Sequence, residues 1–122
     1  MKKGKNVILI TLDCVRPEAL GCYRANFKKR FFFKFWNKTP SIDSLARDGI
    51  LFEQAICQAP FTPASHASIL TGLNPYNHGI REMIGSKLSG LNKVKTLAEV
   101  LKNNNYQTAA FIGSHALGSE YG

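Results

Sequence analysis

No stretch of this 122-residue sequence approaches the roughly 20 consecutive apolar residues that a membrane-spanning helix needs. The apolar run from Val7 to Leu12 follows positive charge, as in a signal peptide, but it is short and Asp13 ends it. Cysteines are also few, and Cys14, Cys22 and Cys57 have neither a CxxC nor a metal-type spacing. This usage is typical of reduced, buried thiols, so we expect a soluble, cytoplasmic protein.

Acidic residues are scarce: the chain has 8 of them against 16 lysines and arginines, for a formal net charge of +8. A charge of this size favours association with polyanions. Hydrophobic residues make up 44% and charged residues 20% of the chain, which excludes a disordered tail or a fibrous protein. The length suits a single domain with one core and excludes two domains.

One segment concentrates the positive charge. From Tyr23 to Lys38 the chain holds seven of its 13 aromatic residues, and no acid occurs between Glu18 and Asp43. We interpret residues 24–38 as a basic aromatic insertion loop whose rings pack on the domain while its lysines and arginines stay solvated. Contact with an acidic membrane surface and binding of nucleic acid, by charge plus stacking, are the alternatives.

Apolar, β-branched runs alternate with helical patterns along the chain. Such runs are typical of strands buried in a parallel sheet, and we predict strands at Val7 to Leu12, Ile50 to Ile56 and Thr108 to Ile112. Cap residues, prolines and glycine stops predict helices at Thr39 to Gly49, Pro63 to Leu70 and Thr96 to Asn105. The order indicates an α/β fold with a mostly parallel sheet and helices on both faces.

The stretch from Ala59 to Gly72 carries the candidate chemistry. It opens a predicted helix, whose N-terminus offers unpaired N–H groups and partial positive charge to an anion. Thr62 could attack sulfur or phosphorus there if a metal ion activated its hydroxyl. The alternative from the residues alone is that Thr62 or Ser65 simply caps the helix. Asp13 ends the first predicted strand, where α/β sheets place their ligands.

These segments resemble the sulfatase family of the alkaline phosphatase superfamily. Its signature reads Cys or Ser, any residue, Pro, Ser, Arg, Ala, Ser, any residue, Leu, Thr, Gly, and this chain matches it at Ser65, Ala67-Ser68 and Leu70-Thr71-Gly72. Thr62 then stands at the nucleophile position and His66 at that of the arginine. Other similar segments follow in order: Asn6 to Asp13, Thr39 to Ala46, Thr71 to Gly79 and Thr96 to Phe111. Leu20 to Tyr23 and Gly49 to Phe52 are similar as well, so the resemblance covers nearly everything except Arg24 to Lys38.

The resemblance implies that residues 1–122 are the N-terminal part of a sulfatase-like catalytic domain, a metal-dependent hydrolase of sulfate or phosphate esters. Sulfatases oxidise Cys or Ser to formylglycine, whereas oxidation of Thr62 would give a ketone. Relatives with threonine nucleophiles act on phosphate esters, so the resemblance leans toward phosphodiester and phosphoryl chemistry. It implies Thr62 as nucleophile and His66 as a holder of the oxyanion. His115 is a candidate for the same role, because Ser114 and Ala116 replace the family's lysine and histidine. A structural or solvent-exposed role is the alternative for His115.

The family also implies a divalent metal ion, with Ca²⁺, Mg²⁺, Mn²⁺ and Zn²⁺ as candidates. Hard divalent ions take six or more oxygen ligands, mostly carboxylates. The chain has three aspartates, and Asp43 and Asp48 fall on a predicted surface helix. Asp13 is therefore the expected ligand, with Thr62 as a second. Family ligands from a later strand lie beyond this chain, so we expect it to be truncated and inactive alone.

Two functions follow. The first is hydrolysis of a small-molecule sulfate or phosphate ester; the alternative is a non-catalytic truncated remnant that binds acidic lipid or nucleic acid. A sheet cut partway exposes apolar faces, so we expect self-association or pairing with a missing C-terminal half.

His78, followed by Gly79, is interpreted as a loop anchor. Lys87 and Lys93 are candidates to replace the lost substrate lysine.

Overall fold

The computed structural model describes residues 4–23, 38–83 and 94–118. The chain divides into two compact units, Met1–Ala55 and Ile56–Gly122. The basic aromatic segment, except Lys38, lies outside the described residues, and so do Lys87 and Lys93. The expected roles of these residues therefore stay predictions.

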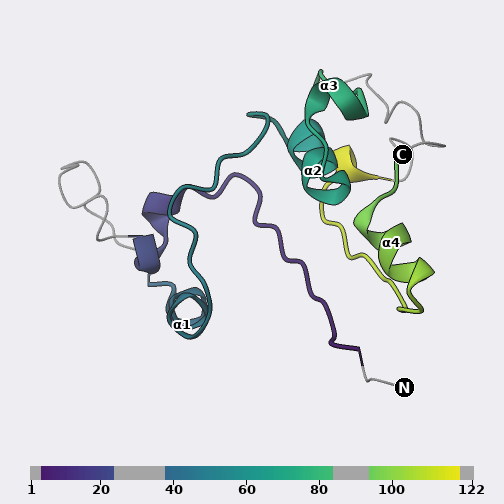
Figure 1. Cartoon of the computed structure of the whole chain (residues 1–122). Coiled ribbons are helices and arrows are strands. Elements are labelled where there is room, and N and C mark those ends of the chain that lie inside the picture. The colour runs from purple at the N-terminus through teal and green to yellow at the C-terminus, as the bar shows by residue number, and fades with distance from the viewer. Residues whose placement is uncertain (1–3, 24–37, 84–93, 119–122) are drawn as a thin grey trace. The chain divides into compact units, whose positions relative to one another are not determined.

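The first unit contains a 3-10 turn, η1, at Pro17–Ala19 and the helix α1 at Pro40–Asp48 (Figure 1). The predicted helix is confirmed, because Thr39 stands at the N-cap, Pro40 in the first turn and Gly49 at the C-cap. Proline suits a first turn, since the N–H group that it lacks would have no partner within the helix.

The start of α1 is tied to the residues around Gly21 by hydrogen bonds. The Thr39 hydroxyl does not cap the helix; it accepts the Gly21 N–H at 2.8 Å and donates to the Asp43 carboxylate at 2.9 Å. Asp43 also accepts the Cys22 N–H at 2.8 Å. Asp43, predicted to lie on a helix surface, is thus half-buried and holds two separate chain segments together.

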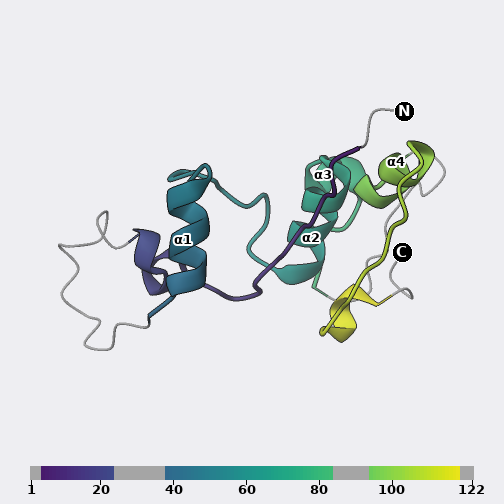
Figure 2. The ribbon, with the colours of Figure 1, turned by 90° about the horizontal axis from the view of Figure 1, so that it is seen from below.

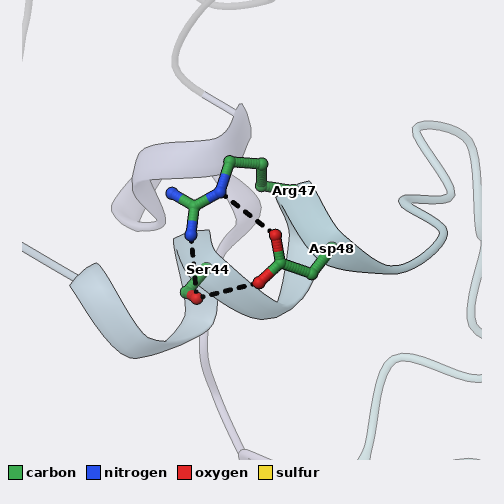
Figure 3. Close-up of polar contacts among 3 residues, drawn as sticks. All are labelled: Ser44, Arg47 and Asp48. Atoms are coloured by element: carbon green, nitrogen blue, oxygen red, sulfur yellow. Dashed lines mark hydrogen bonds and ion pairs between the residues drawn. The ribbon is translucent and has the colours of Figure 1, made fainter.

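The outer face of α1 carries a small polar cluster (Figure 3). Arg47 Nε lies 3.2 Å from Asp48 Oδ1, and Arg47 Nη2 donates to Ser44 Oγ at 3.1 Å. Ser44 Oγ also lies 3.3 Å from Asp48 Oδ2. The side chains of Arg47 and Asp48 are 71% and 67% exposed, so solvent screens the pair and it adds little stability.

The second unit is built around α2, Thr62–Thr71. α3 at Pro75–His78, α4 at Leu97–Asn103 and the 3-10 turn η3 at His115–Leu117 all contact α2. α2 and α3 lie side by side in both views (Figures 1 and 2). The small buried core consists of Ala59, Ala64, Ala67 and Ile80, with Phe61 packed against it. Within the described ranges, no helix is long and apolar enough to cross a bilayer.

Local signals set the ends of these helices. α2 ends where predicted, because Gly72 takes the left-handed φ of 70° and donates its N–H to Ser68. The prediction that Thr62 or Ser65 caps α2 is wrong: Phe61 is the N-cap residue, and Thr62 is already helical. α4 begins with a capping box, in which Thr96 and the Glu99 side chain bond each other's backbone N–H groups.

The predicted α/β fold with a mostly parallel sheet is wrong, since no strand occurs in residues 4–23, 38–83 or 94–118. The three segments predicted as strands are exposed: Ile8 is 82%, Ile50 83% and Phe111 99% accessible. A β-branched run favours extended backbone locally, but a strand exists only where a second segment pairs with its N–H and C=O groups. Among the described residues, none of these segments finds such a partner.

The cysteines also differ from expectation. Cys14 and Cys57 are exposed, and Cys22 is half-buried; all three are free thiols. The predicted burial is therefore wrong for Cys14 and Cys57. Cys14 has a left-handed φ of 57°, which places it in a turn directly after Asp13.

Candidate functional site

The first two turns of α2 hold two of the predicted site residues. Thr62 is the first residue of the helix and is half-buried. His66 lies one turn later, and its Nδ1 is 3.0 Å from the Thr62 carbonyl oxygen. Because a carbonyl oxygen can only accept, Nδ1 carries the proton, and Nε2 of the neutral ring is then an acceptor. This hydrogen bond fixes the imidazole beside the turn that begins with Thr62.

The electrostatics of this turn suit an anion. α2 has ten residues, and no acidic residue lies in its first turn. The partial positive charge of its N-terminus is therefore not neutralised by a neighbouring carboxylate on the helix. The N-cap residue Phe61 supplies no side-chain acceptor to the first N–H groups. A sulfate or phosphate group would find favourable interactions there.

His115 lies on a different element that reaches the same helix. It is the first residue of η3, which packs against α2. The short yellow turn of η3 beside α2 is visible in Figure 1. The His115 side chain is exposed. The structure therefore brings the segment that carries His115 against the helix that carries Thr62 and His66.

Asp13 belongs to the other unit. It is exposed, and its Oδ1 accepts the Cys14 N–H at 3.1 Å. In the part of the chain that the structure describes, no three His, Cys, Asp or Glu side chains form a group that could hold a metal ion. A hard divalent ion takes six or more oxygen ligands, so Asp13 and Thr62 alone do not make such a site.

The structure adds a buried pair that the sequence did not predict. His78 is fully buried, with Nε2 3.0 Å from Ser68 Oγ, and its Nδ1 accepts the Ile80 N–H at 3.2 Å. Because Nδ1 accepts, Nε2 carries the proton and donates to Ser68. Burial lowers the pKa of His78, while a hydrogen bond to the Ala64 backbone opposes this shift. In the sequence, only the glycine after His78 indicated a turn at this position. The burial of His78 and its contact with Ile80 support the interpretation of His78 as a loop anchor.

Comparison with known proteins gives the family. The Sulfatase family model matches residues 5–121. Steryl-sulfatase of Rattus norvegicus is 33% identical over 124 residues, which covers 94% of this chain and 20% of the relative. Arylsulfatase of Clostridium perfringens is 36% identical over 74 residues, which covers 61% of this chain and 14% of the relative. Human (Homo sapiens) iduronate 2-sulfatase is 30% identical over 103 residues, which covers 84% of this chain and 17% of the relative.

The chain thus spans a fifth or less of the length of these curated relatives. No solved structure gives a significant match. The resemblance seen in the motifs is confirmed, because the family model covers almost every residue. This chain belongs to the sulfatase family.

Proposed function

We propose that this chain carries the nucleophile segment of a sulfatase-family hydrolase that acts on sulfate or phosphate esters, with Thr62 as the nucleophile. The observation that carries the proposal is the position of Thr62 as the first residue of α2, with His66 bonded to its carbonyl oxygen. Membership of the family supports ester hydrolysis. Threonine cannot form the aldehyde of formylglycine, so the chemistry leans toward phosphoryl transfer.

The reaction has two halves. Thr62 Oγ forms a bond to the phosphorus or sulfur of the ester, and the bond from that atom to the leaving oxygen breaks with its electron pair. The hydroxyl proton passes to solvent or a base, and the leaving oxygen takes up a proton. Water then attacks the Thr62 ester, which releases phosphate or sulfate and restores the hydroxyl. The sum is one ester plus one water giving one alcohol and one acid anion.

The hydrogen bond of His66 sets a condition on its role. The neutral ring already uses its only N–H on the Thr62 carbonyl. His66 can therefore donate to a developing oxyanion only when both ring nitrogens carry protons. The family's arginine would have five donors and stay charged, so it meets no such condition. We propose His66, in its protonated form, and His115 as the groups that stabilise the oxyanion.

A divalent ion, Ca²⁺, Mg²⁺, Mn²⁺ or Zn²⁺, is part of the proposal, with Asp13 as one ligand. The described residues do not complete the coordination of such an ion. Ester hydrolysis should therefore be measured with each of these ions in turn and again after a chelator has removed the ion.

The test of Thr62 is hydrolysis of an aryl phosphate diester, an aryl phosphate monoester and an aryl sulfate, with peptide mass spectrometry to locate a covalent adduct. We expect Thr62→Ala to lower turnover by roughly 10³-fold or more and Thr62→Ser to retain most of it. Thr71→Ala is the matched control, because Thr71 donates to the Ala67 carbonyl at the other end of α2. Equal activity of Thr62→Ala or an adduct on another residue would refute the proposal. No activity with any ester and ion would instead favour the alternative, a non-catalytic truncated remnant.

The role of His66 is tested by the pH dependence of the same reaction. Since only a ring protonated on both nitrogens has a donor left for the oxyanion, the contribution of His66 should fall as pH rises. We expect His66→Arg to remove this decline and His66→Ala to be less active at every pH. Activity of His66→Ala equal to that of the unaltered chain across the range would exclude the role.

A further inference from the structure

A pocket of about 460 Å³ lies in the second unit, and its lining includes neither Thr62 nor His66. Its walls are residues 58–61, which lead into α2, residues 74–76, where α3 begins, and Arg81. The volume lies in the range of about 300–1,000 Å³ that is typical of small-molecule sites. The lining is mostly apolar and includes two aromatic rings, two amide side chains and one cation.

The cation is the distinctive group of this pocket. The Arg81 guanidinium carbon lies 4.9 Å from the centre of the Tyr76 ring, and Arg81 Nη2 donates to the Tyr76 carbonyl at 3.4 Å. No ion pair among the described residues includes Arg81. The only acidic residue from Ile56 to Met83 is Glu82, which is exposed. Arg81 therefore presents N–H donors and a positive charge that no carboxylate in the described part of the chain pairs with.

The two aromatic side chains that line the pocket differ in burial. Phe61 is half-buried and packs against the small core. Tyr76 is 79% exposed, and its ring carries Arg81 on one face. A guanidinium over a ring still donates hydrogen bonds through N–H groups at its edge, and it binds planar anions such as carboxylates well. The pocket thus offers ring surface and an anion partner side by side.

We propose that this pocket binds an aromatic ring that carries an anionic group, with the ring against Phe61 and Tyr76 and the anion on Arg81. The inference goes beyond the proposed function, because it requires no reaction at Thr62. Either the aryl part of an ester or a free aromatic acid has this chemistry. Phe61 immediately precedes Thr62, so the first source would place the organic part of a substrate next to the proposed nucleophile.

The test is a titration of the 122-residue chain with three small probes, followed by the amide signals of Phe61, Tyr76 and Arg81 in NMR spectra. Benzenesulfonate has the ring and the charge but no ester bond, methanesulfonate has only the charge, and benzyl alcohol has only the ring. We expect benzenesulfonate to bind at least about tenfold more tightly than either of the others. Equal affinity for methanesulfonate would overturn the proposal, because charge alone would then explain the binding.

Variants separate the pocket from general anion binding. We expect Arg81→Gln to raise the dissociation constant of benzenesulfonate about tenfold or more, and Arg81→Lys to recover part of the loss. Arg47→Gln is the matched control, since Arg47 is an exposed arginine of α1 (Figure 3). Unchanged affinity in Arg81→Gln, or an equal loss in Arg47→Gln, would overturn the proposal.

The two sources of the ligand and the two proposals are also distinguishable. Thr62→Ala should abolish hydrolysis and leave the binding of benzenesulfonate unchanged, so the pocket can be confirmed even if Thr62 is not the nucleophile. Competitive inhibition of aryl ester hydrolysis by benzenesulfonate would identify the aryl part of the ester as the ligand. Binding without inhibition would identify a free aromatic acid.

Discussion

The buried His78 should make the second unit sensitive to acid. In the folded chain Nδ1 accepts the Ile80 N–H and Nε2 donates to Ser68, so the neutral ring satisfies both contacts. A second proton would turn Nδ1 into a donor that faces the Ile80 N–H. Burial lowers the pKa of His78 for the same reason that it disfavours any buried charge.

The direction of the pH effect follows from this lowered pKa. The unfolded chain takes up a proton on His78 near pH 6.5, whereas the folded chain resists it. The contribution of neutral His78 to the free energy of unfolding is therefore fully present above about pH 6.5 and is lost as pH falls toward the pKa of His78 in the folded chain. One proton gives a slope of at most about 1.4 kcal/mol per pH unit in that window.

The measurement is urea denaturation at several pH values, together with hydrogen exchange of the Ile80 amide. We expect His78→Gln to be less stable at neutral pH and to lose the acid-dependent slope, because glutamine does not titrate. His115→Gln is the control, since His115 is an exposed histidine of the same unit. If His78→Gln kept the full slope, the assignment of the acid sensitivity to this buried ring would be wrong.

Two further predictions concern the close approach of Asp43 to Gly21 and the capping side chain of Thr96. A Cβ on Gly21 would lie 2.6 Å from the Asp43 carboxyl carbon, so Gly21→Ala should displace the carboxylate and cost about 1–3 kcal/mol in urea denaturation. Gly113→Ala, where nothing lies within 4 Å, should stay within about 0.5 kcal/mol, and equal effects of the two variants would contradict this reasoning. Thr96→Ala should lower the helix signal of α4 and cost about 1 kcal/mol, while Thr96→Ser should not; no difference between them would show that the cap contributes little.

The helices were predictable because their signals are local. Pro40 and Gly49 bound α1, and Gly72 ends α2, where the sequence indicates. Each signal acts through backbone groups within one turn, so no distant residue is needed. The contact of Asp43 with Cys22 was not predictable, because it joins residues 21 positions apart across a segment of different composition.

The prediction of a sheet was wrong because strand pairing is not a local property, and no strand occurs in the described residues. The run from Val7 to Leu12 has the composition of a buried strand, yet Ile8 and Ile10 are exposed. Composition reports what a segment would gain by burial, whereas pairing depends on where another segment lies. The same difference explains Cys14 and Cys57, whose small apolar side chains were expected to be buried and are exposed.

The candidate site on α2 contains one feature that the sequence predicts and one that it does not. The sequence motif placed Thr62 and His66 four residues apart, and this spacing is enough to predict that they share a helix face. It could not predict that His66 Nδ1 is used on the Thr62 carbonyl oxygen, because that choice depends on the side-chain rotamer. The choice matters chemically: an arginine at this position would keep donors for an oxyanion at any pH, whereas the histidine has one only after it is protonated.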